Sequence, residues 1–432
     1  MPAPLASVNP CLGDICPVSR DRHVIKCRLW SYDLLCAGSA DRLHVHLNAR
    51  IIMTIDAAEL ELFRDNVKRF LENEIQPHYE QWEKDSWMPR DIWNKLGENG
   101  LLCVDQPEQY GGVGVPFQYS MVILNEMAKL GLTSLATGVS VHSDICAPYI
   151  EHLAVESVKA AWLPKLASGE AVAAIGMTEP GAGSDLAGIR TTAVRDGDFY
   201  VVNGSKTFIS NGQHADVVIM AVKTDVAAGA KGVSLLLMDT SLPGFQKGKK
   251  LEKMGLHSQD TSELFMDNVR VPADCLLGQE GKGFAYMMNE LPRERLNIAV
   301  IAVAASEGTL ERTVQYVQER KAFGKPLSQL QNTRFTLATC KTEILAARAF
   351  VNNCIDLHAD SKLDIPTGAA VKLYSTELQG RVADACLQMH GGYGYMLEYG
   401  VSRAYIDARI QRIYGGASEI MKEVVARELL GR

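Results

Sequence analysis

The sequence predicts an α+β protein in which a helical domain, a β-barrel-like domain and a four-helix bundle follow one another. Apolar residues recur at helical spacing before about residue 170, short β-rich runs bounded by turn residues follow, and long helical patterns return near residue 281. A chain of 432 residues has room for two or three domains. We therefore predict domains at 53–170, 171–280 and 281–432, after an unstructured extension at 1–52.

The extension differs from the rest of the chain in composition. It holds four of the ten cysteines, six Lys/Arg against four Asp/Glu, and no sustained periodicity. A mitochondrial transit peptide is Arg-rich and poor in acids, so the four aspartates argue against one. We favour a misassigned start, with translation beginning at Met53. Asp56 is then a helix N-cap, and Glu59 has the spacing of a capping box.

The first helical region extends from Asp56 to about residue 166. An apolar series that ends at Ile75 has helical spacing, and Pro77 is expected to stop that helix. Further helices are expected around 89–99, 117–131 and 155–166.

The middle region reads as strands. Residues 196–212 alternate in part and contain Asn203-Gly204, a strong signal for the turn of a β-hairpin. Strands are also expected at 217–224 and 232–239, and a pair of strands at 261–272.

The C-terminal region predicts four long helices with short connections, which is typical of an antiparallel bundle. They cover approximately 284–318, 328–359, 366–390 and 402–430. The last is interrupted by Gly415-Gly416. Two glycines inside a helix cost about 1 kcal/mol each relative to alanine, which indicates a break where backbone comes close to something.

Composition excludes several classes of protein. A net charge of −7 argues against a nucleic-acid binder, which needs a basic face. No apolar run approaches the roughly 20 residues of a transmembrane helix. The ten cysteines form no CxxC pair, so neither a zinc site nor a disulfide framework is indicated. A reducing compartment fits best, either the bacterial cytoplasm or, in a eukaryote, the mitochondrial matrix.

Two motifs of the middle region are candidates for a binding site. MTEPGAGSD, residues 177–185, is a glycine-rich loop whose outward-facing amides suit a phosphate, a carbonyl or a flavin edge. It is not GxGxxG, and a plain surface turn explains it equally well. KTFISNG places Phe208 and Ser210 on a predicted hairpin, where an ordinary strand with Phe208 in the core is the simpler interpretation.

Two further motifs follow helix ends in the C-terminal region. Arg320 to Gly324 combines a cation, an aromatic residue and a C-capping glycine, which a plain helix terminus explains. QMHGGYGYM, residues 388–396, carries three glycines and two tyrosines. Composition explains this second motif less easily.

Together, MTEPGAGSD, KTFISNG, ERKAFGKPLSQLQ, QMHGGYGYMLEY and IYGGASEIMK occur in order, and the chain closely resembles the acyl-CoA dehydrogenase family over nearly all of 53–432. The resemblance implies noncovalent FAD, with the isoalloxazine ring against the β-domain and the adenosine end reaching a neighbouring subunit of a homotetramer. The residues implied at the ring are Met177, Thr178, Ser184, Phe208, Ile209 and Ser210. Those implied at the adenosine end are Arg320, Phe323, Gln331, Gln388, Met389, His390, Gly391 and Gly392, with Glu419. Ala417 stands where relatives often have a threonine that contacts the cofactor.

The family's chemistry requires a carboxylate that removes the α-proton of an acyl-CoA. In many members it follows the tyrosine of the last motif, but that position holds Gly415. Glu419 and Glu290 are alternatives, whereas Glu294 precedes an Arg-Leu pair, as does the base of the long-chain and isovaleryl branches. A solvated residue between Arg293 and Arg295 is the simpler interpretation of Glu294 alone. With Gly415 vacant we predict that Glu294 is the base.

The resemblance also implies contacts with the substrate. The Gly415 amide is expected to donate to the thioester carbonyl together with a flavin ribityl hydroxyl, and Tyr414 and Ser184 to contact the substrate. Arg295 is a candidate either for fixing its helix or for approaching the CoA portion of the substrate. The side chain missing at Gly415 is expected to leave space for a side chain from another helix. Pocket depth is expected to depend on residues such as Ala285, Tyr286 and Met287.

The predicted function is α,β-dehydrogenation of a medium- or long-chain acyl-CoA in fatty acid β-oxidation, with electrons passed to electron-transferring flavoprotein. An isovaleryl-type enzyme, a flavin oxidase or monooxygenase of the same fold, and a non-catalytic relative are the alternatives.

Overall fold

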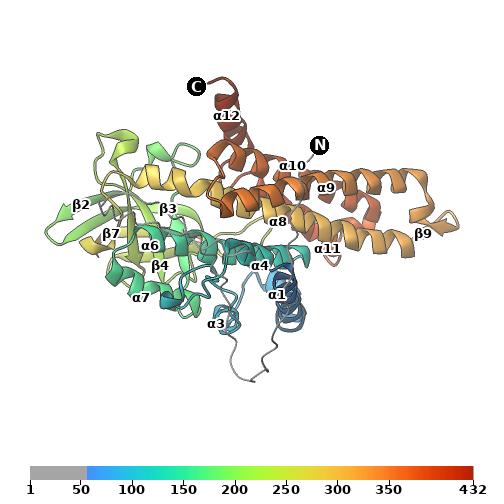
Figure 1. Cartoon of the computed structure of the whole chain (residues 1–432), viewed down its shortest axis with the longest axis horizontal. Helices are drawn as coiled ribbons and strands as arrows, with labels where there is room; N and C mark the ends of the chain where they lie inside the picture. The colour runs from blue at the N-terminus through green and yellow to red at the C-terminus, as the bar shows by residue number, and fades with distance from the viewer. Residues whose placement is uncertain (1–55, 432) are drawn as a thin grey trace, which may run out of the picture. The chain divides into compact units, whose positions relative to one another are not determined.

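The computed structural model describes residues 56–431 (Figure 1). The predicted extension and the proposed start at Met53 lie outside the described residues. Within them the order of elements is helices, one large sheet, then long helices, so the predicted fold class is confirmed. No helix of the described part of the chain is long and apolar enough to cross a bilayer.

The N-terminal helices that the sequence predicted begin close to their expected residues. Asp56 caps the first helix, accepting a hydrogen bond from the Ala58 amide at 2.8 Å. Pro77 does not end the run, because the π-helical turn Leu71–Ile75 intervenes and places Pro77 in the first turn of the next helix, where its missing N–H is tolerated. The helices are α1 (Ala57–Phe70), α2 (Gln76–Asp85), α3 (Asp91–Glu98), α4 (Phe117–Lys129), α5 (Thr133–Val139), α6 (Ala147–Leu153) and α7 (Glu156–Ala167).

The sequence did not predict α5, α6 and the π-helix Ser140–Cys146 between them. Almost every residue of this stretch is buried. A helix that is buried on all sides has no polar face, so it lacks the period that identifies amphipathic helices.

The middle region forms one eight-stranded sheet in the order β6-β7-β3-β2-β4-β5-β8, with β1 paired to β4. The strands are β1 (Ala173–Gly176), β2 (Thr192–Asp196), β3 (Phe199–Ser210), β4 (Val217–Lys223), β5 (Val233–Asp239), β6 (Phe245–Lys250), β7 (Thr261–Pro272) and β8 (Leu276–Leu277). Alternate residues of β4 face two cores: Val218 and Met220 pack among the strands themselves, as in a barrel-like sheet, while Ile219 joins the core shared with the helices. The outermost strands β6 and β8 are not paired with each other in the described sheet.

Two predictions about strands were wrong. The hairpin turn lies at Gly197, with Asp196 paired to Phe199, and Asn203-Gly204 lies inside β3. Gly204 has φ +151° at a bulge, and a Cβ there would lie 2.4 Å from Thr191 Oγ1. The glycine therefore allows Thr191 to pack closely against β3 and does not form a turn. Residues 261–272 form a single strand, β7.

The C-terminal helices are α8 (Gly283–Glu319), α9 (Gln331–Ala359), α10 (Ile365–His390), α11 (Gly400–Gln411) and α12 (Ser418–Leu429). The short strands β9 (Lys321–Ala322) and β10 (Lys325–Pro326) pair between α8 and α9. Helix α10 packs against α8, α9, α11 and α12, and α8 also packs against α4 (Figure 1). The expected fourth helix is two helices, because residues 412–417 leave helical geometry at the glycine pair.

Candidate active site

A cavity of about 480 Å³ lies where parts of all three regions meet. Its walls come from α5 and the following π-helix, the loop 177–187, the end of β3, α8, and the segment 414–416 with α12. Elements far apart in the sequence therefore meet around one space.

The glycine-rich loop and the end of β3 form one wall. Met177, Thr178, Ser184, Phe208, Ile209 and Ser210 all line the cavity. Phe208 is not a core residue: its backbone has φ +60° and its side chain is 67% exposed. An exposed aromatic ring beside a loop whose Gly181 and Gly183 adjoin open space fits a planar, ring-bearing cofactor.

A buried ion pair holds this loop in place. Lys206 Nζ lies 2.8 Å from Glu179 Oε1 and also donates to the Met177 carbonyl at 3.1 Å. Glu179 in turn accepts hydrogen bonds from the amides of Arg190 and Thr191. Since an isolated buried charge is strongly unfavourable, each partner requires the other, and the pair fixes the shape of the loop.

Glu294, on α8, lines the cavity and is only 7% exposed, so it is not a solvated residue. The Tyr149 hydroxyl, on α6, donates to Glu294 Oε1 at 3.0 Å. Burial raises the pKa of Glu294 to about 7, and the hydrogen bond from Tyr149 opposes that rise. The carboxyl group is therefore partly ionised near neutral pH. Sequence reasoning missed Tyr149, which no local motif marks.

The other candidate carboxylates do not line the cavity. Glu290 Oε1 lies 2.9 Å from His152 Nδ1, and Glu419 is exposed near the start of α12. Asp185 and Glu423 line the cavity but are exposed. Glu294 is therefore the single buried carboxylate of the cavity among the residues described.

The glycine pair forms a further part of the wall. Gly415 has φ +63° and Gly416 φ +101°, both in the region that favours glycine. A Cβ on Gly415 would lie 2.4 Å from Ile298 Cδ1. The space beside Gly415 is thus occupied by a side chain from another helix, as expected, but that side chain is Ile298, one helical turn after Glu294 on α8. Tyr414 also lines the cavity, and its hydroxyl donates to Gln411 Oε1 at 2.7 Å.

The apolar part of the wall differs from the prediction. Phe284, Met288 and Leu291 line the cavity, whereas Ala285, Tyr286 and Met287 do not. The helical phase of α8 decides which of these neighbours points inward. The helix that was not predicted adds Thr137, Ser140, Val141 and Ile145.

A second cavity, of about 560 Å³, collects the other predicted cofactor residues. It is lined by Arg320 and by Gln388, Met389, His390, Gly391 and Gly392. The Arg320 guanidinium lies over the ring of Tyr393, 5.2 Å from its centre. Phe323, Gln331, Ala417 and Glu419 line neither cavity, and Phe323 is 92% exposed.

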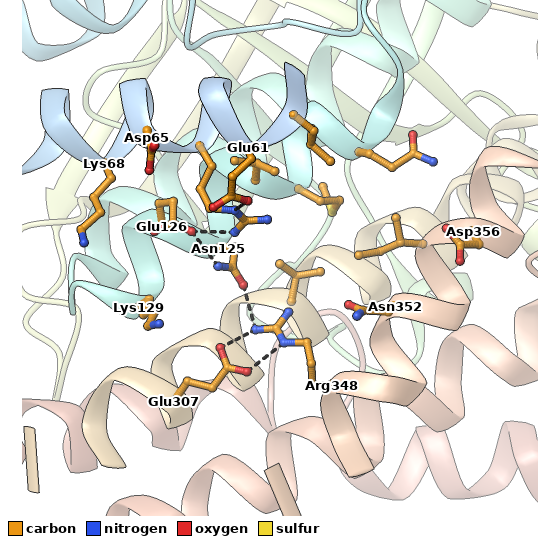
Figure 2. Close-up of a pocket in the computed structure, with 17 residues that line it drawn as sticks. Glu61, Asp65, Lys68, Asn125, Glu126, Lys129, Glu307, Arg348, Asn352 and Asp356 are labelled. Carbon is orange, nitrogen blue, oxygen red and sulfur yellow. Dashed lines mark hydrogen bonds and ion pairs between the residues drawn. The ribbon is translucent and has the colours of Figure 1, made fainter. Parts of the chain in front are cut away.

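A third cavity, of about 590 Å³, lies between α1, α4, α8 and α9 (Figure 2). Arg348 donates to both oxygens of Glu307, at 2.9 and 2.7 Å, and to Asn125 at 2.8 Å. Arg64 pairs with Glu126 at 2.8 Å. Because both guanidinium groups already have carboxylate partners, this network among the described residues connects helices.

Comparison with known proteins identifies relatives over almost all of the described chain. Family models for the N-terminal, middle and C-terminal domains of acyl-CoA dehydrogenase match residues 57–170, 174–269 and 281–430. The long-chain specific acyl-CoA dehydrogenase of Sus scrofa is 46% identical over 381 residues, 88% of each chain.

Solved structures agree with these relatives. The crystal structure of acyl-CoA dehydrogenase from Geobacillus kaustophilus has a TM-score of 0.85 and 48% identity, and the match covers 87% of this chain and 99% of that one. A glutaryl-CoA dehydrogenase from Mycobacterium smegmatis in complex with FADH2 has a TM-score of 0.82 and 29% identity, covering 88% and 96% of the two chains.

Proposed function

Because the chain belongs to the acyl-CoA dehydrogenase family, we propose that it oxidises long-chain acyl-CoA thioesters with Glu294 as the catalytic base. It is an acyl-CoA dehydrogenase that uses FAD. The observation that carries the assignment of the base is the burial of Glu294 in the wall of the cavity, beside the glycine pair.

Glu294 removes the α-proton of the thioester. A thioester α-proton is weakly acidic, so the base must be desolvated and correctly oriented. Burial supplies the desolvation, and the hydrogen bond from Tyr149 orients the carboxylate. A carboxyl group whose pKa is about 7 is matched to proton abstraction near neutral pH.

The Gly415 amide N–H donates to the thioester carbonyl and stabilises the negative charge that develops on its oxygen. Neither the Gly415 nor the Gly416 amide has a backbone acceptor among residues 56–431. Ser184, Arg295 and Tyr414 line the same cavity and contact the substrate beside it.

The loop 177–185 and residues 208–210 would hold the flavin ring of FAD, which would supply a hydride acceptor for the β-carbon of the substrate. Arg320 and residues 388–392 would hold the adenosine end, with Phe323, Gln331 and Glu419. Their separate cavity and the exposed Phe323 support contribution to a neighbouring subunit's FAD, and hence a homotetramer. Ala417 stands where relatives often have a threonine that contacts the cofactor. Electron-transferring flavoprotein is the proposed acceptor, and the boundaries at 53, 171 and 281 stay predictions.

The test is an anaerobic titration of the purified holoenzyme with saturated acyl-CoAs of graded length and branching. We expect straight long-chain substrates to bleach flavin absorbance fastest. Preferential bleaching by isovaleryl-CoA would overturn the chain-length proposal, and no bleaching by any acyl-CoA would overturn the proposed function.

The base is tested by Glu294→Gln under single turnover, with FAD content measured in parallel. The carboxamide cannot take the proton, so we expect flavin reduction to fall by a factor of about 10⁴ or more, within the range for loss of a catalytic base. Glu290→Gln, one turn earlier on α8, is the matched control: it removes a charge that raises the pKa of Glu294 but leaves the base in place, so flavin reduction should stay rapid. Rapid reduction in Glu294→Gln would exclude Glu294.

A further inference from the structure

Lys372 has an environment that ordinary helix packing does not explain. It lies in the first half of α10, is 0% exposed, and donates from Nζ to the Gly416 carbonyl oxygen at 2.7 Å. Lysine is among the residues least often fully buried. No carboxylate lies within ion-pairing distance of Lys372 in the described structure. The hydrogen-bond partner of its ammonium group is therefore the backbone carbonyl of Gly416.

A second buried cation approaches the same loop from α8. Arg295 is 4% exposed, and its Nε lies 3.4 Å from the Gly415 carbonyl oxygen. Two successive carbonyls, those of Gly415 and Gly416, therefore each face one buried cation. The two cations belong to different helices, so the loop is held from two sides.

The glycine pair needs such support. Glycine has more backbone freedom than any other residue, and both glycines adopt a positive φ. The N–H groups of Gly415 and Gly416 have no backbone acceptor among residues 56–431. Backbone hydrogen bonds from these two amides therefore do not fix the orientation of their peptide planes. Lys372 does not line the cavity, whereas Gly415 and Gly416 do. Lys372 therefore affects a bound ligand through the conformation of the loop that contains Gly415 and Gly416.

We propose that Lys372 is a positioning residue. It anchors the Gly416–Ala417 peptide through the carbonyl oxygen, and Arg295 anchors the Gly415–Gly416 peptide in the same way. With both peptides held, the loop keeps the Gly415 amide N–H, in the peptide before them, directed at the thioester carbonyl of the substrate. The proposal rests on the role proposed above for Gly415. A preorganised donor stabilises a developing oxyanion without the cost of reorientation during the reaction. The loss of Lys372 therefore affects the transition state more than substrate binding.

The charge of the ammonium acts in the same direction. Lys372 and Arg295 bring two buried positive charges to the loop that carries the Gly415 amide, where little water screens them. Burial, and then the neighbouring Arg295, lower the pKa of Lys372 to about 8, while Glu377 and Glu419 oppose that shift.

The test compares Lys372→Met, which keeps the length of the side chain without the ammonium, with Lys372→Gln, which keeps a donor. Thr376→Val is the control: Thr376 is equally buried one turn further along α10, and its hydroxyl donates to carbonyls of its own helix. The probe is a 3-thiaacyl-CoA of the length that bleaches the wild-type flavin. It can lose its α-proton but has no β-methylene to give a hydride, so its enolate remains beside the oxidised flavin and is seen as a long-wavelength absorbance band.

We expect Lys372→Met to retain FAD and to bind the probe. Its KM for the acyl-CoA substrate should stay close to the wild-type value. Its kcat should fall about 10- to 100-fold, somewhat less than for complete loss of an oxyanion donor, and its long-wavelength band should weaken. Lys372→Gln should lie between it and the wild type, and Thr376→Val should match the wild type.

A wild-type kcat and band in Lys372→Met would overturn the proposal. So would loss of FAD in proportion to activity in both Lys372 variants, because the residue would then be structural. If the wild-type enzyme neither formed the band nor was bleached by any acyl-CoA, the proposed function would fail before the variants were compared.

Discussion

Replacing Tyr149 by phenylalanine removes the hydroxyl that donates to Glu294 at 3.0 Å and leaves the packing of the ring in place. A hydrogen bond to a charged group contributes about 1.5–3 kcal/mol, and the neutral acid keeps part of its own interactions. A net loss of about 1.4 kcal/mol for the ionised form corresponds to a rise of about one pKa unit. The pKa of Glu294 would then lie about one unit above its present value of about 7.

The direction of the pH effect follows from the ionised form being the active one. At pH 6 both enzymes are mostly protonated, so a rise of about one unit lowers the fraction of ionised base about tenfold. At pH 9 both are mostly ionised, and the two rates should nearly coincide. We therefore expect the ratio of wild-type to Tyr149→Phe kcat/KM to fall from about 10 at pH 6 towards 1 at pH 9, since kcat/KM reports the free enzyme.

The matched control is Tyr200→Phe. Tyr200 is also buried, and its hydroxyl donates to a carboxylate, Glu280, at 2.7 Å, but it lies in the β-domain outside the cavity. The ratio of wild-type to Tyr200→Phe kcat/KM should stay near 1 at every pH. A Tyr149→Phe defect of equal size at pH 6 and pH 9, or no defect at either, would refute the assignment of Tyr149 as a residue that tunes the base.

Three further outcomes follow from the same geometry. The wild-type kcat/KM should rise as pH increases through about 7, because Glu294 must lose its proton to act; a profile that is flat between pH 5.5 and 8 would contradict this. Gly415→Ala should lower stability by about 1–2 kcal/mol, because alanine disfavours a positive φ and its Cβ would meet Ile298 Cδ1. Ile298→Val in that background removes the clashing methyl group and should recover part of the loss in a thermal melt, whereas no recovery would show that backbone strain alone is responsible. Lys206→Met leaves Glu179 buried without its partner, at a cost of about 3–5 kcal/mol for a broken buried pair, and should speed FAD release followed by flavin fluorescence. Lys250→Met, at a partly exposed lysine of β6, is the control, and equal FAD release from both variants would argue against an anchoring role for Lys206.

Local sequence predicted the elements whose patterns are periodic. The long C-terminal helices, strands β4 and β5 and the capped start of α1 all appear close to their expected bounds. Local rules failed where the environment sets the conformation. Asn203-Gly204 has the composition of a turn, but Gly204 lies at a bulge inside β3, where Thr191 packs too close for a side chain.

The residues of the candidate site also fall into those that could be named from the sequence and those that only the structure revealed. The resemblance to the family named Glu294 from the sequence, because relatives that lack the usual base carry a carboxylate before an Arg-Leu pair and this chain has Gly415 at the usual position. The sequence also named the loop 177–185 and the residues of β3 that line the cavity with Glu294. Only the tertiary structure decided that Glu294 is buried, that Tyr149 reaches it from α6, and that Lys372 holds the glycine loop. Burial, hydrogen bonding and the pKa values that depend on them arise between residues far apart in the chain, so no periodicity or motif records them.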